Sequence, residues 1–106
     1  MSTDIPRYEA LVEAFPTSEV PRFSLACAYM EANRYEDAEA AFAAAIDIKP
    51  DYLMAWVQRA RVLVTLEREE AAAEVCRHAM GLAQAQGHRG PLEDCEAILE
   101  EIEGDL

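Results

Sequence analysis

The sequence repeats itself at a spacing of 34 residues, and this period constrains the fold more than any other feature. Small residues coincide at this spacing, in the pairs Ala26 and Ala60, Ala38 and Ala72, and Ala45 and Ala79. Large residues coincide as well, in the pairs Tyr29 and Leu63, Phe42 and Cys76, and Ile46 and Met80. A fixed period of this length is typical of proteins in which each unit packs only on its neighbours. We therefore predict stacked units, and not a helical bundle with an accidental periodicity.

Each unit is predicted to be a pair of helices. Apolar residues fall at helical spacing along the chain, Ala is abundant and Gly is scarce, so no strand is expected. Asn33 suits the tight turn inside a pair, because asparagine tolerates a left-handed backbone. A shift back by 34 residues places Phe42 on Tyr8 and Pro50 on Pro16. The first helix is therefore interpreted as the second half of a repeat.

The pattern predicts one all-α domain over residues 1–106, with about six helices. Its parts are a leading half-repeat helix over 4–16, a first repeat over 19–52, a second repeat over 53–86 and a C-terminal capping helix over 91–103. The capping helix has one apolar stripe and one acidic face, as expected of an element that covers the stack and faces water. Gly87 and Gly90 are expected to bracket the loop before it.

The repeats carry a recognisable set of residues. They are Leu25, Ala26, Tyr29, Ala38, Phe42, Ala45 and Pro50 in the first repeat, and Trp56, Ala60, Ala72 and Ala79 in the second. At these positions the chain resembles the tetratricopeptide repeat family, and in particular its short stand-alone members in bacteria. The chain departs from the family pattern at Arg22, Arg59, Leu63, Cys76 and Gln84. The resemblance implies a right-handed α-solenoid of antiparallel helix pairs.

The resemblance also implies a concave groove, lined by the first helix of each pair, that binds a protein partner without catalysing a reaction. The groove residues expected from it are Val20, Phe23, Cys27, Met30, Met54, Val57, Gln58, Arg61 and Val64, with Leu92, Cys95 and Leu99 added by the final helix. Such an apolar, sulfur-containing groove suits an amphipathic helix or an extended peptide. Family members that clamp the acidic tails of chaperones carry Lys and Asn at these positions. The residues that stand there instead are Phe23, Cys27, Gln58 and Arg61, so a carboxylate clamp is not expected.

A second function stays open on the sequence alone. No helix precedes the first one, so Ile5, Tyr8 and Val12 are expected to be partly exposed. A contiguous apolar patch at these residues would favour a homodimer. Structural self-association, through this patch or through the groove, is therefore the alternative to peptide binding.

Charge and composition argue against several other functions. The formal charge is −12 and Lys49 is the one lysine, whereas binding to nucleic acid needs clustered basic residues. No apolar run approaches the roughly 18 residues that span a bilayer, and the N-terminus lacks the pattern of a signal peptide. A cytoplasmic location without a membrane partner is therefore expected.

The cysteines and histidines do not predict a reactive site. Three cysteines without a Cys-x-x-Cys pair predict neither a disulfide framework nor a metal site. Cys76 and His78 lie two residues apart on a helix, so they do not share a face and do not form a nucleophile–base pair. We therefore expect no enzymatic activity and no cofactor.

Overall fold

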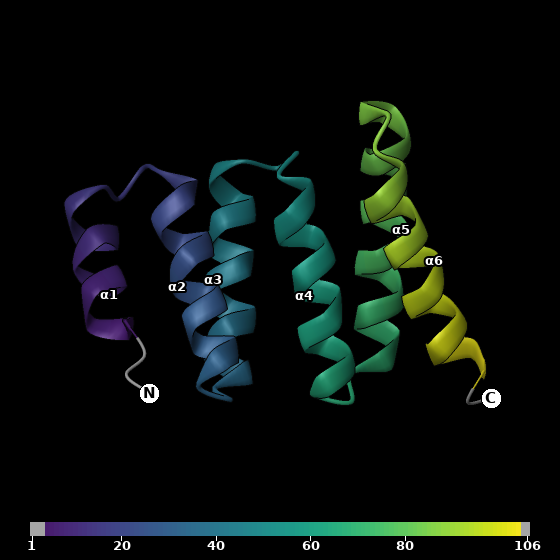
Figure 1. Cartoon of the computed structure of the whole chain (residues 1–106), viewed down its shortest axis with the longest axis horizontal. Helices are drawn as coiled ribbons and strands as arrows, with labels where there is room; N and C mark the ends of the chain where they lie inside the picture. The colour runs from purple at the N-terminus through teal and green to yellow at the C-terminus, as the bar shows by residue number, and fades with distance from the viewer. Residues whose placement is uncertain (1–3, 105–106) are drawn as a thin grey trace.

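The structure, a computed structural model, describes residues 4–104 as six α-helices and no strand (Figure 1). The helices are α1 (Ile5–Ala14), α2 (Glu19–Glu31), α3 (Tyr35–Ile48), α4 (Leu53–Thr65), α5 (Glu69–Gln86) and α6 (Arg89–Gly104). Residues 1–3 and 105–106 of the predicted domain lie outside the described residues, and the first three of them belong to the segment tested for a signal peptide. The all-α prediction is confirmed. None of the described helices is both long and apolar enough to cross a membrane.

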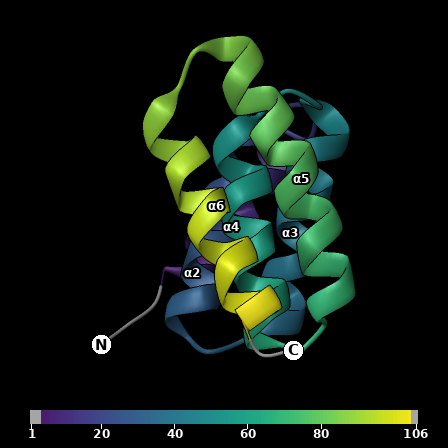
Figure 2. The ribbon, with the colours of Figure 1, turned by 90° about the vertical axis from the view of Figure 1, so that its right-hand side faces the viewer.

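The helices form two layers of a solenoid. Each of α2 and α4 packs extensively on the helix that follows it, and α3 packs on α4, which joins one pair to the next. When the molecule is viewed from its C-terminal end, α2, α4 and α6 lie on one side and α3 and α5 on the other (Figure 2). The faces of α2, α4 and α6 that point away from α3 and α5 are called the inner face below.

The turns inside the two pairs are copies of each other. Asn33 and Glu67, 34 residues apart, both adopt a left-handed backbone with φ of 60°. The amide of Arg34 donates to the carbonyl of Tyr29 at 2.8 Å, and the amide of Arg68 donates to that of Leu63 at 2.9 Å. This bond closes the end of a helix that would otherwise leave its last carbonyls unsatisfied. The turn predicted at Asn33 is confirmed, and its copy tolerates a glutamate.

The core consists of two clusters that meet between the helix pairs. One cluster lies around Phe42, and the other lies around Val57 and Cys76, all of which are fully buried. Trp56 packs against both clusters, and its indole Nε1 donates to the carbonyl of Pro50 at 2.8 Å. The small residues of the repeat are fully buried where helices approach closely, and they are Ala26, Ala38, Ala45, Ala60, Ala72 and Ala79. Burial of the apolar side chains is the main favourable term in the folding of such a stack.

The start of α6 differs from the sequence prediction. Gly90 lies inside the helix, and Gly87, with φ of 71°, makes the turn together with His88. The prediction that Gly90 closes a loop is wrong, because α5 extends to Gln86 and leaves room for only a two-residue connection. The helices α5 and α6 therefore meet at a sharp corner, which stands above the rest of the molecule in Figure 1.

The apolar face of α1 packs against α2 and is only partly exposed. Ile5 is buried, with 8% of its surface exposed, and the half-buried Tyr8 and Val12 also contact the first core cluster. The expectation that these residues are partly exposed is confirmed for Tyr8 and Val12 and wrong for Ile5. The reason is that α1 packs this face against α2, which buries Ile5 and leaves part of the other two side chains at the surface.

Candidate functional site

Eight of the nine predicted groove residues are exposed or partly exposed at the molecular surface. Val20 and Met54 are exposed at 55% and 40%, and they lie at the beginning of α2 and of α4. The other six are half-buried, and they are Phe23, Cys27, Met30, Gln58, Arg61 and Val64. Half-buried side chains of this kind can contact a partner without leaving the positions that the fold gives them.

Val57 is a correction to the predicted set. It is 0% exposed and belongs to the core cluster that joins α4, α5 and α6. The same holds for Cys95 of α6, which is 0% exposed in that cluster. A partner therefore cannot contact either side chain at the surface of this fold.

The register of α6 explains why the sequence misplaced Cys95. The 34-residue period pairs Cys95 with Arg61, a groove position. In the structure Cys95 is buried like Ala60, and Ile98 is buried like Leu63. Equivalent positions of α4 and α6 are therefore 35 residues apart, and not 34. Because α5 has 18 residues where α3 has 14, and the connection after it is shorter, the period changes before α6. A comparison of the two predicted helix lengths could have revealed the shift.

An aromatic wall joins α2, α3 and the residue just before α4. The ring of Phe23 lies 5.5 Å from that of Phe42 in an edge-to-face arrangement and 5.1 Å from that of Tyr52, measured between centroids. Aromatic pairs at such separations are favourable beyond their buried area. Tyr52 lies just before α4, so a groove predicted from helical positions did not include it. Burial, followed by the nearby carboxylate of Glu19, raises the pKa of the Tyr52 hydroxyl.

A hollow of about 220 Å³ opens between α1 and α2. Its lining consists of Asp4, Tyr8, Phe23, Ser24, Cys27, Ala28 and Glu31. The thiol of Cys27 lies in it half-buried, and burial followed by the charge of Glu31 raises the pKa of this thiol. The leading helix thus contributes Asp4 and Tyr8 to the site, which a groove built only from the first helix of each pair does not include.

A second hollow, of about 280 Å³, lies between α4 and α6 and is lined by Arg61, Val64, Thr65, Ile98 and Glu101. Arg61 is engaged within it: its Nη2 lies 3.5 Å from Oδ2 of Asp94, and its Nη1 donates to Oε1 of Gln58 at 3.4 Å. The basic residue predicted for the groove is therefore already paired with a carboxylate of α6.

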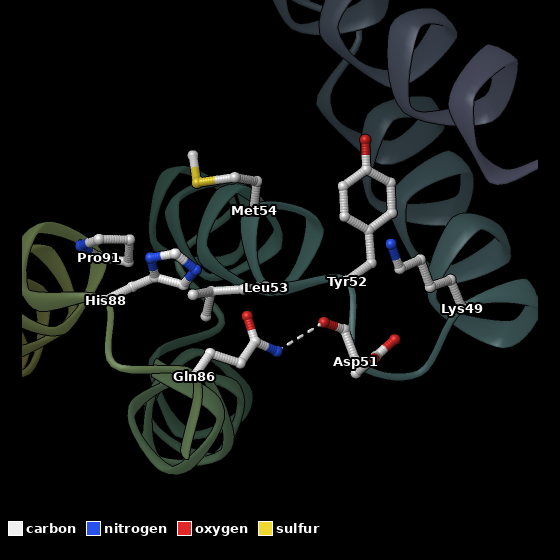
Figure 3. Close-up of a pocket in the computed structure, with 8 residues that line it drawn as sticks. All are labelled: Lys49, Asp51, Tyr52, Leu53, Met54, Gln86, His88 and Pro91. Carbon is white, nitrogen blue, oxygen red and sulfur yellow. Dashed lines mark hydrogen bonds between the residues drawn. The ribbon is translucent and has the colours of Figure 1, made fainter. Parts of the chain in front are cut away.

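A third hollow, of about 260 Å³, lies where α4 begins and α5 turns into α6 (Figure 3). Its lining consists of Lys49, Asp51, Tyr52, Leu53, Met54, Gln86, His88 and Pro91. The side-chain amide of Gln86 donates to the carbonyl of Asp51 at 3.0 Å, which fixes the α5–α6 corner against the start of α4. Met54 and Pro91 offer apolar surface at this end of the inner face.

The remaining thiols and imidazoles are arranged for packing. Cys76 and Cys95 are buried, and a hydrogen bond to Cys95, with burial, raises the pKa of the Cys76 thiol. The exposed His78 stacks on Trp56 with ring centroids 4.0 Å apart, so it does not form a pair with the buried Cys76. Within residues 4–104, no three His, Cys, Asp or Glu side chains gather in a way that could hold a metal ion.

Solved structures with the same fold are numerous, and three show the range. The TPR2B domain of yeast Sti1, in its complex with pHsp70, has a TM-score of 0.90 at 14% identity, over 96% of this chain and 82% of that one. Protein BPP2914 from Bordetella parapertussis has a TM-score of 0.85 at 22% identity, over 99% and 91%. PcrH, in complex with the chaperone binding region of PopD, has a TM-score of 0.89 at 18% identity, over 95% and 77%. At these identities the likeness shows the fold alone.

The sequence itself identifies the family. A comparison with curated proteins finds no match. Two family models described as tetratricopeptide repeat match residues 5–56 and 55–86, so that together they account for α1 to α5. The chain therefore belongs to the tetratricopeptide repeat family, as its repeated residues and its solenoid of helix pairs indicate.

Proposed function

We propose that the protein is a non-enzymatic interaction module that binds a peptide segment of a partner protein along its inner face. The observation that carries this proposal is the set of three hollows beside α2, α4 and α6, each lined by apolar side chains together with polar or charged ones. A surface of this form offers both anchor pockets and a rigid backbone to an extended or helical segment.

Two neighbours of the same fold support the proposal, because each was solved with a protein ligand. They are the Sti1 domain with pHsp70 and PcrH with the chaperone binding region of PopD. The groove side chains of the present chain differ from a carboxylate clamp, since Phe23 and Cys27 lie where such clamps carry Lys and Asn. The binding mode is therefore transferred only as peptide binding by a helical stack.

Peptides selected from a random phage-displayed library are expected to bind the inner face. In spectra of the ¹⁵N-labelled chain, such a peptide should shift the amides of α2, α4 and α6 and leave those on the outer side of α3 and α5 in place. The thiol of Cys27 should be protected from alkylation, because it lines the α1–α2 hollow. Selected peptides that shift mainly α3 and α5 would contradict the proposal.

Covalent modification of the groove is a second test, and modification of an exposed site on α5 is its control. A bulky maleimide at mildly alkaline pH should react first with half-buried Cys27, since Cys76 and Cys95 are 0% exposed. Alkylated protein should lose affinity for the peptide by about tenfold or more. A Cys27→Ser chain alkylated instead at Glu74→Cys, an exposed position on α5, should keep its affinity.

Self-association, the alternative function, could use the exposed apolar residues at the end of α1 and the beginning of α2. The exposed large apolar residues beside α1 are Phe15 and Val20, at 57% and 55%, and they lie at the α1–α2 corner. Light scattering after gel filtration is expected to give a monomer at high micromolar concentration. A dimer that dissociates when Phe15 is replaced by Ser would favour self-association through this corner.

A further inference from the structure

Two hollows of the inner face contain carboxylates that form no ion pair with another residue that the structure describes. Asp4 and Glu31 line the hollow between α1 and α2, and Glu101 lines the hollow between α4 and α6. Arg61 is the basic side chain among the lining residues of these two hollows, and it pairs with Asp94 at 3.5 Å. Among the ion pairs formed by residues 4–104, none involves Asp4, Glu31 or Glu101. These three residues are called the inner acids below.

Three of the other arginines pair with carboxylates away from the inner face. Arg34, Arg59 and Arg68 each pair with a carboxylate of α3, namely Asp37, Glu39 and Glu36. The Arg59–Glu39 pair is the most buried of the three, with its Nε 2.7 Å from Oε1. This distribution of ion pairs matters more than the total charge of −12, because it leaves the three inner acids without an ion-pair partner in the described part of the chain.

The acidic character reaches the middle of the inner face. Besides burial, the charge of Glu31 raises the pKa of Cys27, and the charge of Glu19 raises that of Tyr52. Cys27 lies in the α1–α2 hollow and Tyr52 belongs to the aromatic wall, so both groups report the local field. A bound carboxylate would meet the same unfavourable field.

We infer that the segment bound by the inner face is a basic amphipathic peptide, with Lys or Arg side chains set between apolar anchors. This inference rests on the proposed function and specifies its ligand. The apolar anchors contact the Phe23–Tyr52 wall and the exposed Met54, and the cations face the inner acids. In the α1–α2 and α4–α6 hollows, an acidic segment would have to displace Asp94 from Arg61 to find a basic partner, and the one lysine, Lys49, lines the third hollow. Charge complementarity of this kind selects partners and speeds their encounter.

Three synthetic peptides of equal length test the charge preference. They share the same Leu and Met positions and carry Lys, Gln or Glu at all others, and their binding is measured by fluorescence anisotropy. The Lys peptide should bind about tenfold more tightly than the Gln peptide, and the Glu peptide should bind most weakly. Raising the salt concentration should weaken the binding of the Lys peptide, because its charge contacts with the protein lie near the surface and are screened by salt. Tighter binding of the Glu or Gln peptide would overturn the inference.

Two double variants with equal net charge separate the inner acids from the general negative charge. E31Q/E101Q removes two inner acids, and E70Q/E74Q removes two exposed carboxylates of α5. The affinity for the Lys peptide should fall by about tenfold in the first variant and by about twofold or less in the second. R61Q, which releases Asp94, should bind the Lys peptide more tightly than the wild type does. Equal losses in the two double variants would show that the peptide senses only the total charge.

The failure of this inference and the failure of the proposed function give different results. Library-selected peptides that are acidic or neutral and still shift α2, α4 and α6 would overturn the basic ligand and leave the interaction module in place. If the selected peptides and the Lys peptide shift only the amides of α3 and α5, both the basic ligand and the proposed function are overturned.

Discussion

Replacing Phe42 with alanine is expected to lower the free energy of unfolding by about 3–5 kcal/mol. Phe42 is 0% exposed and is among the largest fully buried side chains of the described residues. It lies on α3, and its ring meets the edge of Phe23 on α2 at 5.5 Å between centroids. Alanine would leave a cavity among helices that are held apart by their neighbours, so the stack could collapse only in part. Such a loss is a large share of the roughly 5–15 kcal/mol that stabilises a domain.

Urea denaturation followed by circular dichroism measures this loss. The control is Phe15→Ala, which removes the same atoms at a position that is 57% exposed and should change the stability by no more than about 0.5 kcal/mol. A loss for Phe42→Ala below about 1 kcal/mol would mean that the first core cluster is not packed as described.

The repeated part of the fold could be predicted because its causes are local and occur twice. Asn33 favours the left-handed turn by its own chemistry, and the 34-residue period places Glu67 at the same point of the second pair. Small residues such as Ala38 and Ala72 are required wherever two helix backbones approach, and the sequence shows them twice at one spacing. Two copies of a pattern therefore define the register of α2 to α5.

The candidate site could be predicted less well, because it depends on the ends of the repeat, where there is no second copy. Asp4 and Tyr8 reach the α1–α2 hollow through the packing of a half-repeat, and Tyr52 enters the aromatic wall from a connection. On α6 the added length of α5 changes the register by one residue, so the predicted Cys95 is buried and Glu101 lines the hollow. A helix register is set by the contacts of the whole helix, and the sequence contains no second copy of α6 that would reveal them.

Exchanging Val57 for aspartate is expected to unfold the protein or to destabilise it by about 3–5 kcal/mol, because it puts an unpaired carboxylate among apolar side chains. Val57 is 0% exposed in the cluster of α4, α5 and α6. The matched control is Val20→Asp, the same chemical change at a residue that is 55% exposed at the beginning of α2. The control should stay within about 0.5 kcal/mol of the wild type.

The pH dependence of this pair of variants identifies the cause. Burial raises the pKa of the carboxyl introduced at position 57 in the folded state above its value in the unfolded chain, so the folded state takes up its proton first as the pH falls. The stability deficit of Val57→Asp relative to Val20→Asp should therefore be largest near neutral pH and shrink as the solution becomes acidic. Urea titrations at several pH values measure it. A Val57→Asp chain as stable as Val20→Asp at neutral pH would place Val57 on the inner face, where the sequence alone had put it, and would require α4 to be rotated about its axis.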